Sequence, residues 1–340
     1  MAGVKLKDIA EKTGVSISTV SRILSGDSNR KMKEETITSV IEAARELGWY
    51  ENRKEKLRHS MPVIKLTAVI IGEDLGGDMS PFCRDIVDGM KREISEKCSG
   101  MRLSFNVIVA ADDILDILKE DPSDAVILIG RVQTDLLEKI AASVPYALYA
   151  GVSSVSGMDQ IVCDAREGVR DAVRYLHGKG HRNIGYIGPT AIQNEIRNEF
   201  RYLGYIEGLS EMGLSYDPIL VEDTYLSVPD GYSGAERLFS RVMPSAIICA
   251  NDSVAIGVLR FLREKDIKCP EEVMVTGFDN IDVSSFIKPS LSTFDVPRTD
   301  LGRFSVRIAV DRIEHHREHA VKVSLPYVIV ERESTKGFRK

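Results

Sequence analysis

Hydrophobic residues in the first fifty positions recur every three or four residues, in three short stretches that polar turns separate. Leu6 and Ile9 lie on one helical face of the first stretch, and Gly14 interrupts the spacing. A glycine at this point is typical of the left-handed residue that ends a helix. The same spacing returns at about residues 16–24 and 34–47. The pattern therefore predicts three short helices, the first two joined by a tight turn.

The second of these helices has a narrow apolar edge and a broad face of hydroxyl groups. Ser16 is placed to cap its N-terminus. The apolar edge comprises Val15, Val20, Ile23 and Leu24, and the opposite face comprises Ile17, Ser18, Ser21 and Arg22. Two short helices with such a turn predict a helix-turn-helix unit, whose second helix can enter the DNA major groove. The alternative is a small helical cap whose serines and threonines are neutral surface.

Residues 49–64 are polar and basic, with Leu57 the only aliphatic side chain before Met61. Such a segment is too short to hold a helix unaided. One interpretation is a linker between domains. The other is a hinge that folds on DNA against its copy from a second subunit, with Leu57 wedged between base pairs in the minor groove.

From residue 65 onward, short strand-like runs alternate with amphipathic stretches. A first series of strands is predicted at 66–72, 103–109, 125–130, 146–150 and 160–163, with helices at about 82–97, 112–119 and 134–143. A second series has strands at 183–188, 219–221, 246–250, 273–277 and about 292–294, with helices near 197–213, 231–243, 251–265 and 298–315. Two further strands, at about 321–325 and 327–332, are expected to close a sheet. The alternation predicts two lobes of doubly wound parallel sheet, with a ligand cleft between them.

Charge is unevenly distributed along the 340 residues. The net charge of −6 by itself argues against a nucleic-acid binder, but residues 1–60 hold 12 basic and 9 acidic side chains, which leaves −9 for the rest. Five scattered cysteines without a C-x-x-C pair predict reduced thiols in a cytoplasm. No apolar run is long enough to span a bilayer, and no secretory signal opens the chain, so no membrane partner is expected.

Polar residues follow several of the predicted strands. Arg201 opens a helix, Asn251 and Asp252 follow SAIICA, and Asp279 follows VMVTGF together with Asn280. A guanidinium and a carboxylate can each bond two vicinal hydroxyls, so the set suits a polyhydroxylated ligand. The same residues also suit helix caps and turns, and the residues alone leave both interpretations open.

Other candidate chemistry is weak. G-Y-I-G-P-T at 185–190 lacks dinucleotide-binding spacing, and His315, His316 and His319 are expected to be a solvated helix end. We therefore predict no catalytic residue, no metal and no cofactor, and a protein that is not an enzyme.

The stretch K-D-I-A-E-K-T-G-V-S-I-S-T-V-S-R-I-L resembles the N-terminus of the LacI/GalR family of bacterial transcription regulators. A-N-D-S-V-A-I-G-V-L, V-T-G-F-D-N and P-S-L-S-T-F follow in the order and spacing of that family's effector-binding domain. The resemblance implies a helix-turn-helix domain at 1–48, a hinge at 49–64 and a periplasmic-binding-protein-like body at 65–340. It divides the body into an N-lobe, at about 65–163 plus 298–325, and a C-lobe, at about 164–297 plus 326–335.

The resemblance also implies roles for individual residues. The expected base readers are Ile17, Ser18 and Arg22, and the expected backbone or flanking contacts are Leu6, Ser16, Thr19, Ser21 and Asn29, with Leu57 in the hinge. The expected effector ligands are Arg201, Asn251 and Asp279, with Glu73, Asp74 or Asp78 replacing an aspartate that the family often has near Ala150, and with Phe82, Tyr225 or Leu226 stacking on a sugar. Lys5 departs from the usual threonine cap, and the hinge departs from the family's pattern at residues 54–57.

These features predict a homodimeric transcriptional repressor of a pseudo-palindromic operator. A small sugar, galactose or a β-galactoside, is the expected effector. The alternatives are a regulator co-repressed by a purine or other ligand, and a two-lobed sugar-binding protein of transport or chemotaxis.

Overall fold

The computed structural model describes residues 4–25, 33–49, 63–71, 79–98, 101–109, 113–130, 134–153, 155, 157–191 and 199–336. The chain divides into two compact units. The first comprises Met1–Ile64 and Lys97–Ser104, and the second comprises Lys65–Glu96 and Phe105–Lys340.

Three helices form the head within the first unit: α1 (Leu6–Thr13), α2 (Ile17–Ser25) and α3 (Glu34–Glu46). Their core consists of Ile9, Ala10, Val20, Val40, Ala43 and Ala44. Gly14 has φ 70° and donates its N–H to the Ala10 carbonyl at 2.9 Å, which confirms the predicted left-handed turn. Lys5 supplies no side-chain cap to α1. Instead, the Asp8 carboxylate accepts the Lys5 backbone N–H at 2.7 Å, which is half of a capping box.

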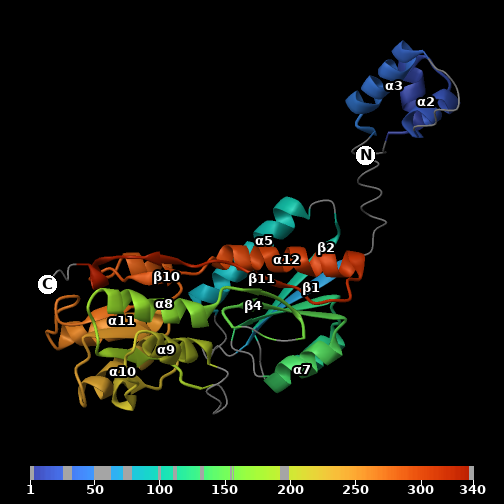
Figure 1. The fold of residues 1–340 in the computed structure, drawn as a ribbon. Helices are drawn as coiled ribbons and strands as arrows, with labels where there is room; N and C mark the ends of the chain where they lie inside the picture. Colours follow the sequence, from blue (N-terminus) through green and yellow to red (C-terminus); the bar gives the residue numbers. More distant parts are fainter. Residues whose placement is uncertain are drawn as a thin grey trace. The chain divides into compact units, whose positions relative to one another are not determined.

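The second unit contains a six-stranded sheet with the order β11-β5-β4-β3-β1-β2. The β1–β3, β3–β4, β4–β5 and β5–β11 pairs are parallel. Its strands are β1 (Ile64–Ile71), β2 (Leu103–Val109), β3 (Ala125–Gly130), β4 (Tyr146–Gly151), β5 (Asp159–Val162) and β11 (Lys322–Ser324), and its helices are α5 (Pro81–Lys97), α6 (Ile114–Glu120), α7 (Thr134–Ser143) and α12 (Arg298–His315). Figure 1 shows α12 running along this sheet, and it contacts β3, β4 and β5.

A second sheet has four parallel strands in the order β7-β6-β8-β9. The strands are β6 (Ile184–Ile187), β7 (Val221–Glu222), β8 (Ala246–Cys249) and β9 (Met274–Thr276), and the helices are α8 (Ala165–Gly178), α9 (Phe200–Glu211), α10 (Val228–Phe239) and α11 (Asp252–Glu264). Helices α8 and α9 pack side by side (Figure 1). Their backbones touch at Gly204, where an added Cβ would lie 2.2 Å from the Arg166 carbonyl oxygen.

The chain crosses between the two sheets three times. It passes from β5 to α8, returns after β10 (Thr293–Asp295) into α12, and crosses again between β11 and β12 (Val328–Val330). Strands β10 and β12 pair antiparallel as a separate ribbon. Polar residues at these crossings therefore lie where the two lobes of the second unit meet.

The predicted α/β fold is confirmed, and most expected elements agree with the structure within a few residues. Helix α8 was missed, although its buried residues Ala165, Val169, Ala172, Val173 and Leu176 lie at helical spacing. The strand expected at 219–221 is wrong in part, since Pro218–Leu220 forms a 3-10 turn and the strand begins at Val221. Among the described residues, no helix is both long enough and apolar enough to cross a membrane.

Candidate DNA interface and effector site

Helix α2 presents its predicted face to solvent. Val20 on the inner edge is fully buried, whereas Ile17 is 48% exposed and Ser18, Ser21 and Arg22 are also exposed. The structure therefore brings the expected base readers together on one surface.

Hydroxyl groups gather at the start of α2. The Ser16 hydroxyl accepts the Thr19 backbone N–H at 3.2 Å, as the cap prediction requires. The same oxygen lies 2.9 Å from the hydroxyls of Ser18 and Thr19. The N-terminus of a helix favours anions, so this cluster suits a DNA phosphate.

Not every expected DNA contact lies on this surface. Leu6 is half-buried and packs against the core of the head. Asn29 and Leu57 lie outside the described residues, so their expected contacts stay predictions.

In the second unit, Arg201 occupies the first turn of α9. The side chain is 6% exposed, and its guanidinium lies 5.9 Å from the centroid of the Phe278 ring. Among the described residues its Nε atom has no hydrogen-bond partner. A buried, unpartnered N–H of a charged group is costly, so it is available to a ligand.

Asp279 follows β9 on a tightly turned loop, with φ 109° at Asp279 and 55° at Asn280. Its carboxyl is 4% exposed, and Oδ1 finds no hydrogen-bond partner within the described part of the chain. Burial raises the pKa of Asp279 to about 7; the charges of Arg201 and Arg298 oppose this shift, and that of Asp252 adds to it. Loop geometry, burial and an open acceptor all distinguish Asp279 from an ordinary turn residue.

Asn251 and Asp252 have structural roles. Asn251 caps α11, with Oδ1 accepting the Val254 N–H at 2.9 Å and Nδ2 donating to the Leu226 carbonyl at 3.2 Å. Asp252 is completely buried and accepts hydrogen bonds from the hydroxyls of Ser284 and Thr293, both at 2.6 Å. These contacts match the cap interpretation, which leaves Asn251 a second Oδ1 lone pair and a second Nδ2 N–H for a ligand.

The expected N-lobe contribution to the effector site stays a prediction. Glu73, Asp74 and Asp78 lie outside the described residues. Phe82 is half-buried at the start of α5, and Tyr225 is 78% exposed. Nothing in the described geometry joins either ring to Arg201 or Asp279.

Sequence reasoning missed Tyr149, which is 2% exposed on β4 and donates its hydroxyl to the Gly130 carbonyl at 3.2 Å. An added Cβ at Gly151 would lie 2.5 Å from that hydroxyl, so Tyr149 fills the space beside the residue where the family often has an aspartate. Burial raises the pKa of Tyr149, and the charge of Arg201 opposes the shift. Nothing in the sequence indicates that a tyrosine inside a strand will fill the space beside Gly151.

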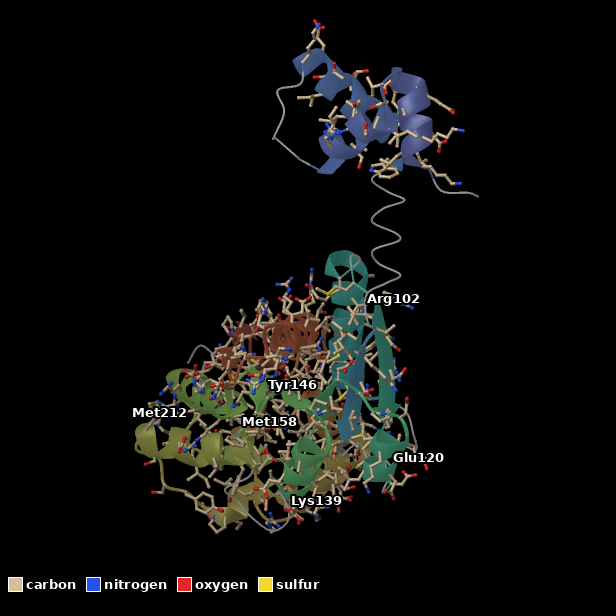
Figure 2. All side chains as sticks on the ribbon, turned by 90° about the vertical axis from the view of Figure 1, so that its right-hand side faces the viewer. Arg102, Glu120, Lys139, Tyr146, Met158 and Met212 are labelled. Carbon is tan, nitrogen blue, oxygen red and sulfur yellow. The ribbon has the colours of Figure 1, made fainter. Side chains whose placement is uncertain are left out.

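The three histidines near the end of α12, His315, His316 and His319, are exposed, as predicted. His316 ends the helix with φ 47°, and its Nδ1 lies 3.2 Å from the hydroxyl of Tyr146. Figure 2 labels Tyr146, whose ring also lies 5.7 Å from the Arg312 guanidinium. Among the described residues, no group of histidine, cysteine and carboxylate side chains is arranged to hold a metal.

Two family models match the chain. The model for bacterial regulatory proteins of the lacI family matches residues 5–52, and the model for a periplasmic binding protein-like domain matches residues 173–335. The HTH-type transcriptional repressor PurR of Pasteurella multocida (strain Pm70) is similar, with 26% identity over 338 residues and 98% of each chain covered.

Solved structures agree with this comparison. A complex of the transcriptional regulator CelR with cellobiose has 26% identity and a TM-score of 0.69, and covers 97% of this chain and 99% of its own. The Lac repressor dimer bound to operator and the anti-inducer ONPF shares the fold, with 23% identity, a TM-score of 0.69 and coverage of 98% and 99%.

A helix-turn-helix head together with a two-sheet body defines a DNA-binding regulator that carries a ligand-binding domain. The chain belongs to the LacI family of transcriptional regulators and is a DNA-binding repressor of that family. Its relatives are transcriptional regulators, which confirms the prediction that the protein is not an enzyme.

Proposed function

We propose that this repressor acts in the cytoplasm as a homodimer on a pseudo-palindromic operator, and that a small sugar controls its DNA affinity. The exposed face of α2 supports the first part. Ile17, Ser18 and Arg22 share that face, and an arginine there can take the O6 and N7 atoms of guanine. The similarity to a repressor solved as an operator-bound dimer supports the dimeric arrangement.

One observation carries the sugar proposal: a buried acceptor on Asp279 and a buried donor on Arg201 lie open within the described residues. A hydroxyl both donates and accepts, so one sugar hydroxyl satisfies both groups without adding charge. The CelR complex, whose ligand is cellobiose, supports a carbohydrate as the ligand class.

Galactose or a β-galactoside is the proposed effector within that class. The short hinge and the A-N-D-S-V-A-I-G-V-L-R segment resemble the repressor of the evolved β-galactosidase operon. Glu73, Asp74 and Asp78 remain the proposed N-lobe ligands, and Phe82 and Tyr225 the proposed stacking residues.

The proposed switch is a shift between two arrangements of the body. A sugar that binds one arrangement more tightly favours it, and only the difference in affinity moves the equilibrium, typically by about 1–3 kcal/mol. In the proposed inducing mode, the favoured arrangement separates the hinges, including Leu57, and the operator is released.

Operator binding tests this proposal. Fluorescence anisotropy of the full chain against a selected palindromic duplex and its scrambled copy should show a clear preference for the palindrome. Addition of D-galactose or methyl β-D-galactopyranoside should weaken that binding. Equal affinity for both duplexes would refute sequence-specific repression, whereas tighter binding with hypoxanthine would favour a co-repressed regulator.

A further inference from the structure

Arg298 occupies the point where the chain returns from the second sheet to the first. It is the first residue of α12 and lies three residues after the end of β10 at Asp295. The side chain is 9% exposed, so its charge must be neutralised within the protein. It is therefore a buried cation at a crossing between the lobes.

Each lobe supplies a partner for this guanidinium. Nε donates to Oδ2 of Asp85 on α5 at 2.8 Å, and Nη2 donates to the Asn280 carbonyl at 3.2 Å. The third nitrogen, Nη1, is buried and lacks a hydrogen-bond partner among the residues that the structure describes. One residue thus joins the N-lobe helix to the loop of Asp279 and retains an open donor.

Arg201 and Arg298 flank Asp279 along its own loop. Arg201 stacks over Phe278, the residue before Asp279, and Arg298 holds the carbonyl of Asn280, the residue after it. The charges of both arginines act on the Asp279 carboxyl. Three buried polar atoms without a hydrogen-bond partner among the described residues therefore belong to this loop or to the arginines beside it. They are Nε of Arg201, Oδ1 of Asp279 and Nη1 of Arg298.

We propose that Arg298 is a further effector-binding residue that transmits effector occupancy to the N-lobe through Asp85. This inference rests on the proposed carbohydrate effector and names a new residue of its site. A hydroxyl that donates to Asp279 Oδ1 has two lone pairs, which accept from Arg201 Nε–H and Arg298 Nη1–H. Since Asp85 already neutralises Arg298, the set favours a neutral polyol over an anion.

The loop that carries Asp279 is held firmly enough to transmit such a change. The Asn280 side chain accepts from Arg332 Nη2 at 2.7 Å and donates to Asp295 Oδ1 at 2.9 Å. A ligand that binds Arg298 therefore contacts a side chain that is hydrogen-bonded to this fixed loop and to Asp85 of α5. Effector binding should favour the arrangement in which this bridge is intact.

The test compares Arg298→Gln with Arg303→Gln in the full chain. Arg303 lies on the same helix and also pairs with α5, through Nε to Glu93 at 3.0 Å, so it controls for loss of a helix–helix ion pair. Calorimetric titrations with D-galactose, methyl β-D-galactopyranoside and cellobiose give the affinity of each variant. Arg298→Gln should bind about tenfold or more weakly, and Arg303→Gln within about twofold of the wild type.

Equal affinity of Arg298→Gln and the wild type would overturn the inference and leave the sugar proposal standing. If no probe binds the wild type, the sugar proposal fails, and this inference fails with it. Should Arg298→Gln not fold, Arg298→Lys keeps the charge but loses the planar fork and gives the same comparison.

Discussion

The pH dependence of stability should report directly on Asp279. Its pKa is about 7 in the folded protein against an ordinary 3.8, because the buried carboxylate loses its hydration. The folded state therefore keeps a proton that the unfolded state has lost. The stabilisation is complete below about pH 4 and disappears as the pH rises through 7. A difference of about three pKa units corresponds to about 4 kcal/mol at most.

Asp279→Asn removes this titration while it keeps the shape of the side chain. The unfolding free energy of the variant minus that of the wild type should increase as the pH rises from 4.5 to 8. The increase should approach the limit of about 4 kcal/mol. Urea denaturation of the full chain at several pH values, followed by circular dichroism, gives the difference. Asp252, with a pKa raised to about 6, remains in both proteins.

Asp282→Asn provides the matched control, since Asp282 is an exposed aspartate near the same loop. Its stability curve should run parallel to that of the wild type. Parallel curves for Asp279→Asn and the wild type would refute the buried, proton-retaining carboxyl. Asp279→Asn should also lose its response to the effector, and a normal response would remove Asp279 from the proposed site.

Three further substitutions test the DNA-binding face, the packing of α8 against α9 and the hinge. Arg22→Ala should cost about 1–3 kcal/mol of operator affinity and leave scrambled-duplex affinity nearly unchanged in anisotropy measurements; an equal loss on both duplexes would assign Arg22 to phosphate contact. Gly204→Ala should lower the unfolding free energy by about 1–3 kcal/mol, because the new methyl would lie 2.2 Å from the Arg166 carbonyl; unchanged stability would show that α8 and α9 separate easily. Leu57→Ala should weaken operator binding and reduce the DNA bend measured by gel mobility, and an unchanged bend would contradict the wedge.

Local patterns were sufficient for the head and for most of the body. Gly14 predicted the turn and Ser16 predicted the cap of α2. Both signals can be read from the sequence because they depend only on neighbouring residues. Strand and helix alternation likewise predicted two parallel sheets. Helix α8 was not predicted, although its buried apolar residues lie at the spacing of an amphipathic helix.

The proposed effector site was predictable only in part. Arg201, Asp279 and Asn251 were expected from the sequence, and the structure adds that Asn251 caps α11. Neither Tyr149 nor the proposed ligand Arg298 carried a signal in the sequence. Arg298 meets Asp85 across 213 positions of the chain.

The amino-acid sequence alone determined the repeating elements, the turn chemistry and the solvent-exposed side of α2, since each depends on residues a few positions apart. Only the tertiary structure decided which polar atoms are buried without a partner and how far burial shifts the pKa of Asp279. Those properties depend on surroundings that segments distant in the chain supply, because desolvation and charge act through space.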